Sequence, residues 1–298
     1  MTAVLDMQRV QKRFGPVKAL DGVSFSVCPG ERIALLGHNG AGKTTLFRLI
    51  LAFLKPDAGS VKILGASPGA PSARRAISYL PESVAFPKNL TGAEVIALYA
   101  RLKRTAQRDG VEALERVGLA AAAARRVGGY SKGMRQRLGL AIAALGHPKL
   151  VLLDEPTSGL DPQSRAEFYS YFDHLSDAGA AIIFSSHTLN DINSNAGRIL
   201  ILKSGALVGD GAEASLRESA GLLTTLRLRV DAAQASATAA RLGGHVNGDG
   251  RIVIECAPDQ KVATLARVMA AGEPFQDIDI SDPSLADIFR AYSQEKRG

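Results

Sequence analysis

The sequence predicts an α/β protein, in which a parallel-sheet domain with a helical insertion precedes a small α+β domain. A short buried strand at 32–36 leads directly into a glycine-rich turn and an apolar-periodic helix at 44–54. Further along, aliphatic strands at 150–153 and 181–185 enclose a helical pattern at 163–178. Strands that alternate with helices in this way are typical of a parallel sheet covered by helices.

Two regions of the first domain depart from this alternation. Residues 4–27 alternate polar and apolar side chains through two strand-like stretches with a turn at Gly15-Pro16, which predicts an N-terminal antiparallel β subdomain. Residues 72–127 show apolar positions at helical spacing, which predicts a helical insertion. We place the helical subdomain at about 83–145.

The pattern changes again after about residue 220, so we place a first domain at 1–220 and a second at 221–298. The second domain shows strand and helix patterns in the order β-α-β-α-β and ends in a short helix. The expected strands are 224–230, 251–256 and 275–280, and the expected helices are 233–242, 260–271 and 283–292.

The composition is that of an ordinary globular protein. The 298 residues carry a net charge of +7 and a pI near 9.5, which suits an anionic partner such as a nucleotide. The basic residues lack the interleaved aromatics of a nucleic-acid surface, so we expect no nucleic-acid partner. Cys28 and Cys256 have no metal-ligand spacing and predict buried thiols. No secretion signal and no run near the ~18 apolar residues of a membrane span is found, so we expect a soluble, cytoplasmic protein.

The strongest local signal follows the strand at 32–36 and matches the phosphate-binding pattern G-x-x-x-x-G-K-[ST]. It consists of Gly37-His38-Asn39-Gly40-Ala41-Gly42-Lys43-Thr44. The glycines let backbone N–H groups wrap phosphates, Lys43 can reach them, and the Thr44 hydroxyl can coordinate Mg²⁺. The alternative is a glycine-rich turn with an exposed lysine, and the flanking strand and helix favour the P-loop. The guanine-binding pattern Asn-Lys-x-Asp is absent from the sequence, so we expect ATP and Mg²⁺ as cofactors.

An acidic pair, Asp154-Glu155, follows the strand at 150–153. Ligands of open α/β sheets bind at the carboxyl ends of the strands, where these carboxylates are expected. Asp154 is suited to hold Mg²⁺, and Glu155 is suited to accept a proton from an attacking water. Such a pair alone is often only a solvated strand end, but its position after a P-loop favours a nucleotide site.

Further elements lie between and after these motifs. They are Tyr130-Ser131-Lys132-Gly133-Met134-Arg135-Gln136, then Ser158-Gly159-Leu160-Asp161, then His187. In this order the motifs resemble the ABC ATPase family over about residues 1–215. The resemblance implies that Ser131 and Gly133 contact the γ-phosphate held by a second copy, so that two subunits sandwich the nucleotide. It also implies that Asp161 crosses the dimer interface and that His187 acts at the γ-phosphate.

The resemblance assigns two more positions, and both depart from the usual family residue. Phe14 falls where an aromatic residue, usually Tyr, stacks on adenine, although a core phenylalanine is the alternative. Glu82 replaces a Gln that touches Mg²⁺ and faces the membrane partner, and its extra charge leaves that metal contact open. The implied catalytic residues are Glu155, His187 and Lys43, and the implied Mg²⁺ ligands are Thr44, Glu82 and Asp154. The implied ATP-binding residues are Phe14, Gly37, His38, Asn39, Gly40, Ala41, Gly42, Lys43, Thr44, Thr45, Ser131, Gly133 and Asp161.

The helical insertion and the segment 283–289 resemble exporter-type ABC ATPases that work with separate membrane subunits. This likeness implies a peripheral location on the cytoplasmic face of the inner membrane. It also implies two kinds of partner, a second copy of the chain and polytopic permease subunits.

Within that branch, residues 37–39, 79–84 and 130–140 look most like the ATPase subunits of Nos transporters, which serve copper-site maturation of nitrous oxide reductase. A periplasmic accessory protein, reached through the permease, would then be a further partner. The histidines and cysteines of the chain show no ligand spacing, so copper chemistry would belong to those partners. Exporters of drugs or polysaccharides share most of these motifs and are the alternative.

Two other classes are weaker. A soluble ABC ATPase that acts on ribosomes or DNA usually carries two cassettes or a long coiled coil, and this chain has one cassette. A nucleotide-binding scaffold without hydrolysis is disfavoured by the intact Asp154-Glu155 pair.

Overall fold

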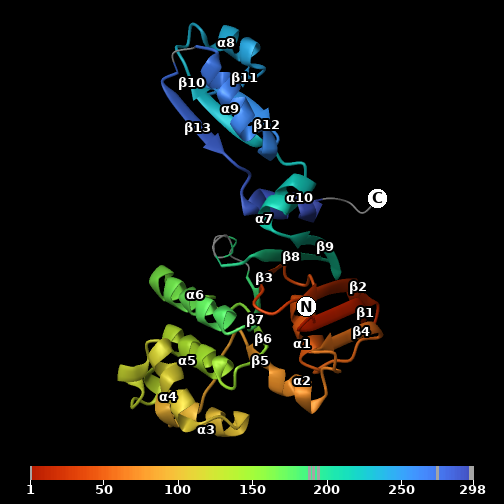
Figure 1. Ribbon diagram of the computed structural model, residues 1–298, viewed down its shortest axis with the longest axis vertical. Coiled ribbons are helices and arrows are strands. Elements are labelled where there is room, and N and C mark those ends of the chain that lie inside the picture. The colour runs from red at the N-terminus through yellow and green to blue at the C-terminus, as the bar shows by residue number, and fades with distance from the viewer. Residues whose placement is uncertain (1, 187–188, 190–191, 193–194, 273–274, 295–298) are drawn as a thin grey trace. The chain divides into compact units, whose positions relative to one another are not determined.

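The computed structural model describes residues 2–186, 189, 192, 195–272 and 275–294 (Figure 1). The chain divides into two compact units, Met1–Asp210 and Gly211–Gly298. The division falls before residue 220, because helix α7 (Glu213–Ser219) belongs to the second unit. Across the described residues, no helix is both long and apolar enough to cross a bilayer.

A six-stranded sheet forms the centre of the first unit, with the strand order β5-β6-β7-β3-β8-β9. The neighbours from β5 to β8 pair in parallel, which confirms the predicted parallel-sheet core. Strands β6 and β7 are buried along their whole length, as expected for strands covered on both faces. The strands are β3 (Arg32–Leu36), β5 (Ile77–Leu80), β6 (Leu150–Leu153), β7 (Ala181–Ser185), β8 (Arg198–Lys203) and β9 (Ala206–Gly211).

The predicted antiparallel subdomain forms a second sheet with the order β2-β1-β4. It consists of β1 (Leu5–Phe14), β2 (Val17–Val27) and β4 (Ala58–Ile63), all paired antiparallel. One hydrophobic core joins this sheet to the parallel sheet and to helix α1 (Lys43–Ile50). Met7 on β1, Phe47 on α1 and Ile183 on β7 are buried within it. The P-loop is therefore fixed at both ends by elements that share one core.

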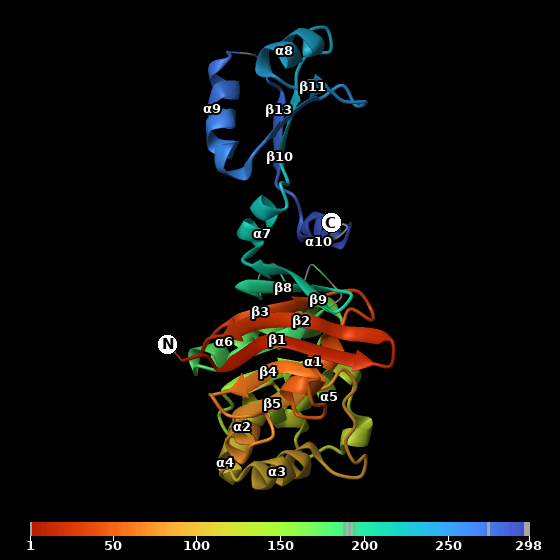
Figure 2. The same cartoon turned by 90° about the vertical axis from the view of Figure 1, so that its right-hand side faces the viewer.

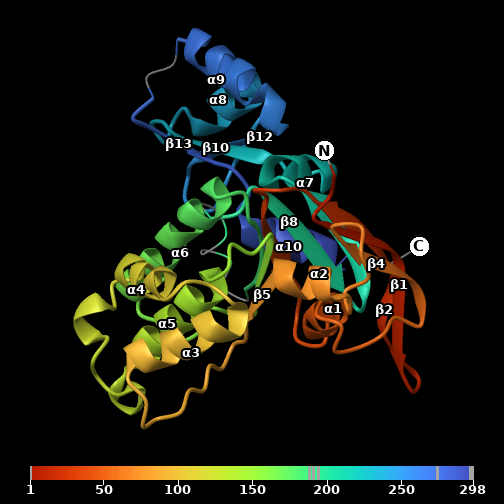
Figure 3. The same cartoon turned by 60° about the horizontal axis from the view of Figure 1, so that its bottom comes forward.

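Helices α3, α4 and α5 gather on one side of the first unit, and the antiparallel sheet lies on the other (Figure 3). Helix α3 begins after Thr91, whose hydroxyl and backbone N–H form a reciprocal capping box with Glu94. The alanine-rich stretch between α4 and α5 forms only a short 3₁₀ turn at Ala120–Ala122. The helices of this unit after α1 are α2 (Pro71–Ala76), α3 (Gly92–Lys103), α4 (Gln107–Arg116), α5 (Lys132–Ala144) and α6 (Pro162–Asp177).

Lys103, the last residue of α3, ties this helix to the end of α5. Its Nζ donates to the carbonyls of Ile142, Ala143 and Leu145 at 2.9, 3.2 and 3.0 Å. It also donates to the Ser78 hydroxyl on β5 at 2.7 Å. The ammonium thus satisfies carbonyls that the C-terminus of α5 leaves without helical partners. Burial lowers the pKa of Lys103 to about 8.

This lowered pKa predicts a pH-dependent difference between the wild type and Lys103→Met. Between pH 8 and about 10.5 the unfolded lysine is protonated more fully than the folded one, so folding releases a proton. The free energy of unfolding of the wild type, relative to Lys103→Met, should therefore rise across this window by up to ~3 kcal/mol, since one pKa unit is worth about 1.4 kcal/mol. Denaturant unfolding at pH 7.5 and 10 measures this. A difference between the wild type and Lys103→Met that stays flat from pH 7.5 to pH 10 would contradict the prediction.

The second unit contains a four-stranded antiparallel sheet with the order β11-β12-β10-β13. In chain order it runs βαββαβ, which is the ferredoxin-like arrangement. Helices α8 and α9 pack on one face of the sheet (Figure 2), where Leu226, Leu228 and Ile254 are buried. The sequence pattern missed β11, which has only two residues. The elements are β10 (Thr224–Arg229), α8 (Ala235–Leu242), β11 (His245–Val246), β12 (Ile252–Cys256), α9 (Lys261–Ala270), β13 (Asp277–Ser281) and α10 (Leu285–Gln294).

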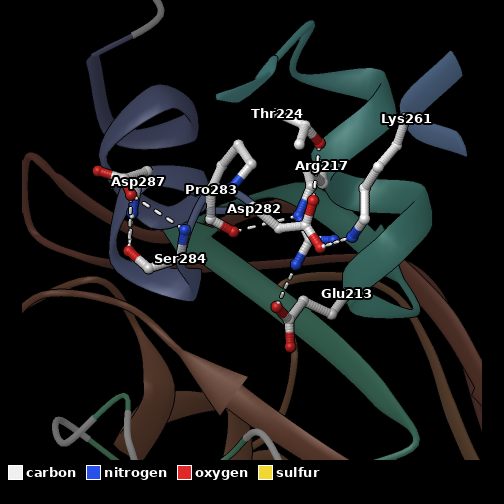
Figure 4. Close-up of polar contacts among 8 residues, drawn as sticks. All are labelled: Glu213, Arg217, Thr224, Lys261, Asp282, Pro283, Ser284 and Asp287. Atoms are coloured by element: carbon white, nitrogen blue, oxygen red, sulfur yellow. Dashed lines mark hydrogen bonds and ion pairs between the residues drawn. The ribbon is translucent and has the colours of Figure 1, made fainter. Parts of the chain in front are cut away.

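A polar network links the two ends of the second unit (Figure 4). Asp282 accepts hydrogen bonds from the buried Thr224 hydroxyl at 2.7 Å and from Lys261 Nζ at 2.6 Å. These two partners, Lys261 first, hold the pKa of Asp282 below its usual value. Arg217 on α7 pairs with Glu213 and donates to the carbonyl of Pro283 at 3.1 Å. The network fixes the segment that leads into α10 against both α7 and the sheet.

Candidate active site

The glycine-rich loop at 37–42 connects β3 to the N-terminus of α1. Inside the loop, the Ala41 N–H donates to the His38 carbonyl at 3.0 Å. From outside, the Gly205 N–H donates to the Ala41 carbonyl at 3.0 Å. Lys43 Nζ donates to the Gly37 carbonyl at 2.5 Å, so the ammonium lies against the loop. The motif thus has the strand-loop-helix context that an anion-binding loop requires.

Two glycines of the loop are required by close packing. A Cβ atom on Gly37 would lie 2.7 Å from the Leu202 carbonyl oxygen on β8. Gly42 has a φ of +111°, and a Cβ there would lie 2.6 Å from the Ala19 carbonyl oxygen on β2. The backbone of the loop therefore approaches two strands more closely than any other residue type permits.

A cleft of about 330 Å³ brings the loop together with the predicted acidic residues. Lys43 and Thr44 line it from α1, and Glu82, Asp154 and Glu155 line it from the carboxyl ends of β5 and β6. These residues come together because β5 and β6 are parallel neighbours, so that their carboxyl ends lie at the same edge of the sheet. The remaining residues of the lining are Val17, Ala19, His38, Asn39, Gly40, Ala41, Gly42 and Thr45.

Hydrogen bonds from neighbouring strands surround the carboxylate of Asp154. Ser185 Oγ donates to Asp154 Oδ1 at 2.8 Å and accepts the Glu155 N–H at 2.8 Å. Tyr79 Oη lies 3.4 Å from Asp154 Oδ2 and donates to it. Burial, followed by the negative charge of Asp154, raises the pKa of Tyr79 to about 12, so its hydroxyl stays a donor at neutral pH. Glu155 has a left-handed backbone with φ +46°.

Several predicted residues do not line this cleft. Phe14 ends β1 with 47% of its surface exposed, opposite Val17 in the β1–β2 pairing, and its contact with adenine stays a prediction. Ser131 caps the N-terminus of α5, with Gly133 in the first turn, and Asp161 caps α6. Their predicted contacts are with a second copy and likewise stay predictions. His187 lies outside the described residues.

The elements predicted to face a second copy lie next to one another. A Cβ on Gly133 would lie 3.5 Å from Ser164 Oγ and 3.7 Å from a methyl group of Leu160. Asp161 accepts the N–H and hydroxyl hydrogen bonds of Ser164 at 2.9 and 2.7 Å, which lower the pKa of its carboxyl. The N-termini of α5 and α6 therefore form one surface of the first unit.

Local sequence patterns do not reveal the roles of Ser185 and Tyr79, although these residues lie within the ranges 181–185 and 79–84 noted above. Only the order of the strands reveals that each flanks Asp154. The signal available in the sequence was a polar residue at the end of an otherwise apolar strand, at Ser185.

Comparison with known proteins identifies the chain. A family model described as ABC transporter matches residues 20–158. The chain is 40% identical to the uncharacterized ABC transporter ATP-binding protein YxlF of Bacillus subtilis, over 72% of this chain and 73% of that protein. It is 34% identical to the daunorubicin resistance ATP-binding protein DrrA3 of Streptomyces coeruleorubidus, over 96% of this chain and 95% of that protein.

Solved structures of ABC transporter subunits have a similar fold. The structure of an ATP binding subunit of an ABC transporter matches with a TM-score of 0.68 and 28% identity, over 73% of this chain and 93% of that one. The P-loop, the acidic strand end and these similarities lead to one conclusion. The chain belongs to the ABC transporter family as an ATP-binding subunit, a class of ATPases that couple ATP hydrolysis to transport, dimerise and work with membrane permease partners.

Proposed function

We propose that the chain powers an exporter of drug-like molecules by hydrolysing ATP in the cleft between the P-loop and Asp154-Glu155. The observation that carries the proposal is the similarity to the daunorubicin resistance ATP-binding protein, which extends over 96% of this chain and so includes the second unit. A linearmycin resistance ATP-binding protein of Bacillus subtilis, LnrL, is 29% identical over 96% of the chain.

In the proposed site, Lys43 and the loop N–H groups bind the phosphates of ATP. The donor set also fits Mg²⁺, because Thr44 offers a hydroxyl and Asp154 and Glu82 offer carboxylates in the same cleft. When bound, the ion would neutralise charge on the phosphate oxygens. Glu155 accepts the proton of the attacking water, and His187 assists at the γ-phosphate.

We propose a homodimer in which Ser131, Gly133 and Asp161 contact the nucleotide held by the partner copy. The permease would dock near Glu82 and the helices α3 and α4, and the chain would sit on the cytoplasmic face of the membrane. The exposed Leu98 and Leu102 on α3 supply apolar surface for such a contact.

A test uses the chain co-purified with its permease in proteoliposomes. Daunorubicin should stimulate ATP hydrolysis by the complex, because cargo binding is coupled to the closure of the dimer, and deletion of the gene should lower the resistance of the cell to the drug. The Glu155→Gln complex serves as the control and should show no stimulated hydrolysis. Co-purification of the chain with ribosomes or DNA, and not with a membrane protein, would contradict the proposal.

The Nos system is the second candidate, on the strength of residues 79–84 and 130–140. The relatives described above are named for drug resistance, or are uncharacterized, and favour the drug exporter. The same deletion strain separates the two. Loss of copper from nitrous oxide reductase with unchanged drug resistance would support the Nos assignment and overturn the drug exporter.

A further inference from the structure

Ser185 joins the two acidic residues of the site through one hydroxyl group. It is the last residue of β7 and has 0% of its surface exposed. Its Oγ donates to Asp154 Oδ1 and accepts the N–H of Glu155, both at 2.8 Å. The hydroxyl thus donates one hydrogen bond to the carboxylate and accepts one from the backbone, and both have the distance of a good hydrogen bond.

The hydrogen bond from the Glu155 N–H to Ser185 holds a residue whose backbone conformation is disfavoured. Glu155 has φ +46°, a left-handed backbone region that residues with a side chain adopt uncommonly and at a cost. Such a conformation persists only where surrounding contacts hold it. The Ser185 hydroxyl supplies one of these contacts, directly at the amide whose orientation sets where the Glu155 side chain begins.

Ser185 and Tyr79 donate hydrogen bonds to different oxygens of the Asp154 carboxylate, from the strands on either side of β6. Tyr79 on β5 donates to Oδ2 and Ser185 on β7 donates to Oδ1. The Asp154 N–H also donates to the Leu80 carbonyl at 2.8 Å, which continues the β5–β6 pairing. The two neighbouring strands therefore fix the plane of the Asp154 carboxylate before any ligand binds. A carboxylate that is already oriented loses less freedom when it takes up a cation.

We propose that Ser185 is a positioning residue for ATP hydrolysis, which orients the Asp154 carboxylate toward Mg²⁺ and holds the backbone of Glu155 in its left-handed conformation. The inference rests on the roles proposed above for Asp154 and Glu155. Ser185 itself is not among the residues that line the cleft, so its proposed role is to position the two acidic residues.

The test compares Ser185→Ala with the wild type, using the full chain. Ser185→Ala should lower kcat by about 10- to 100-fold, the effect of losing one hydrogen bond to a charged group. The Mg²⁺ concentration that half-saturates binding of a fluorescent ATP analogue should rise, because the carboxylate is no longer oriented. Binding of the same analogue in EDTA should be unchanged, since the P-loop is intact.

Two variants separate positioning from general stability. Ser185→Thr retains the hydroxyl and should keep kcat and the Mg²⁺ requirement close to wild type. Ser176→Ala removes a serine hydroxyl that is also buried but has no hydrogen-bond partner among the described residues, and it should change neither quantity.

The inference is overturned if Ser185→Ala matches the wild type in kcat and Mg²⁺ requirement. It is also overturned if the variant loses ATP binding in EDTA as strongly as with Mg²⁺, which would indicate a purely structural role. Failure of the proposed site gives a different result, namely unimpaired hydrolysis by Glu155→Gln.

Discussion

Replacement of Glu155 by glutamine should lower ATP turnover by about 10²–10⁴-fold while ATP binding is retained, because an amide cannot accept the proton of the attacking water. Glu155 lines the same cleft as Lys43 and Thr44, so its carboxylate lies beside the groups that bind the phosphates. Glutamine has nearly the same shape, and the backbone bond from Glu155 N–H to Ser185 does not involve the side chain. The local structure should therefore survive.

Phosphate release measures turnover, and a fluorescent ATP analogue measures binding. Size-exclusion chromatography in ATP should show Glu155→Gln trapped as a dimer, since the nucleotide that closes the two copies is no longer consumed. Glu218→Gln, at an exposed glutamate of α7, makes the same chemical change away from the cleft and should behave as wild type. Full ATPase activity of Glu155→Gln would sink the assignment of Glu155 as the general base.

The second large effect is expected for Gly42→Ala, which should destabilise the first unit by ~3 kcal/mol or more and abolish ATP binding. The new Cβ would lie 2.6 Å from the Ala19 carbonyl oxygen and 2.9 Å from a methyl group of Leu20. Backbone atoms cannot yield cheaply, and the φ of +111° adds strain of about 1–3 kcal/mol. The loop must shift, and the N–H groups that bind phosphate shift with it.

Gly65→Ala provides the matched control. Gly65 also has a positive φ, +79°, but a Cβ there would meet no atom of the described part of the chain within 4 Å. This variant should lose only the strain energy of a left-handed alanine, about 1–2 kcal/mol, and should bind ATP normally. Denaturant unfolding and nucleotide titration measure both variants. Equal losses of stability for the two would contradict the role assigned to the contact with Ala19.

Local patterns were enough to predict the parallel core and the position of the motifs on it. The strands at 150–153 and 181–185 were predicted with the bounds that the structure has, because apolar runs this short, with β-branched residues and turns at their ends, favour a buried strand over a helix. Helix α1 ends at Ile50 instead of residue 54, because Ala52 adopts a left-handed backbone with φ +58° that the apolar spacing does not reveal. The two-residue strand β11 is too short to leave a pattern.

The sequence by itself determined the chemistry of this protein. A P-loop between a strand and a helix, and an acidic pair at a strand end, depend only on neighbours along the chain, and so Lys43, Thr44, Asp154 and Glu155 could be named from it. Only the tertiary structure decided how these groups are held. Ser185 and Tyr79 reach Asp154 because β7 and β5 lie on either side of β6, and that order is set by pairing between segments that are distant in the sequence.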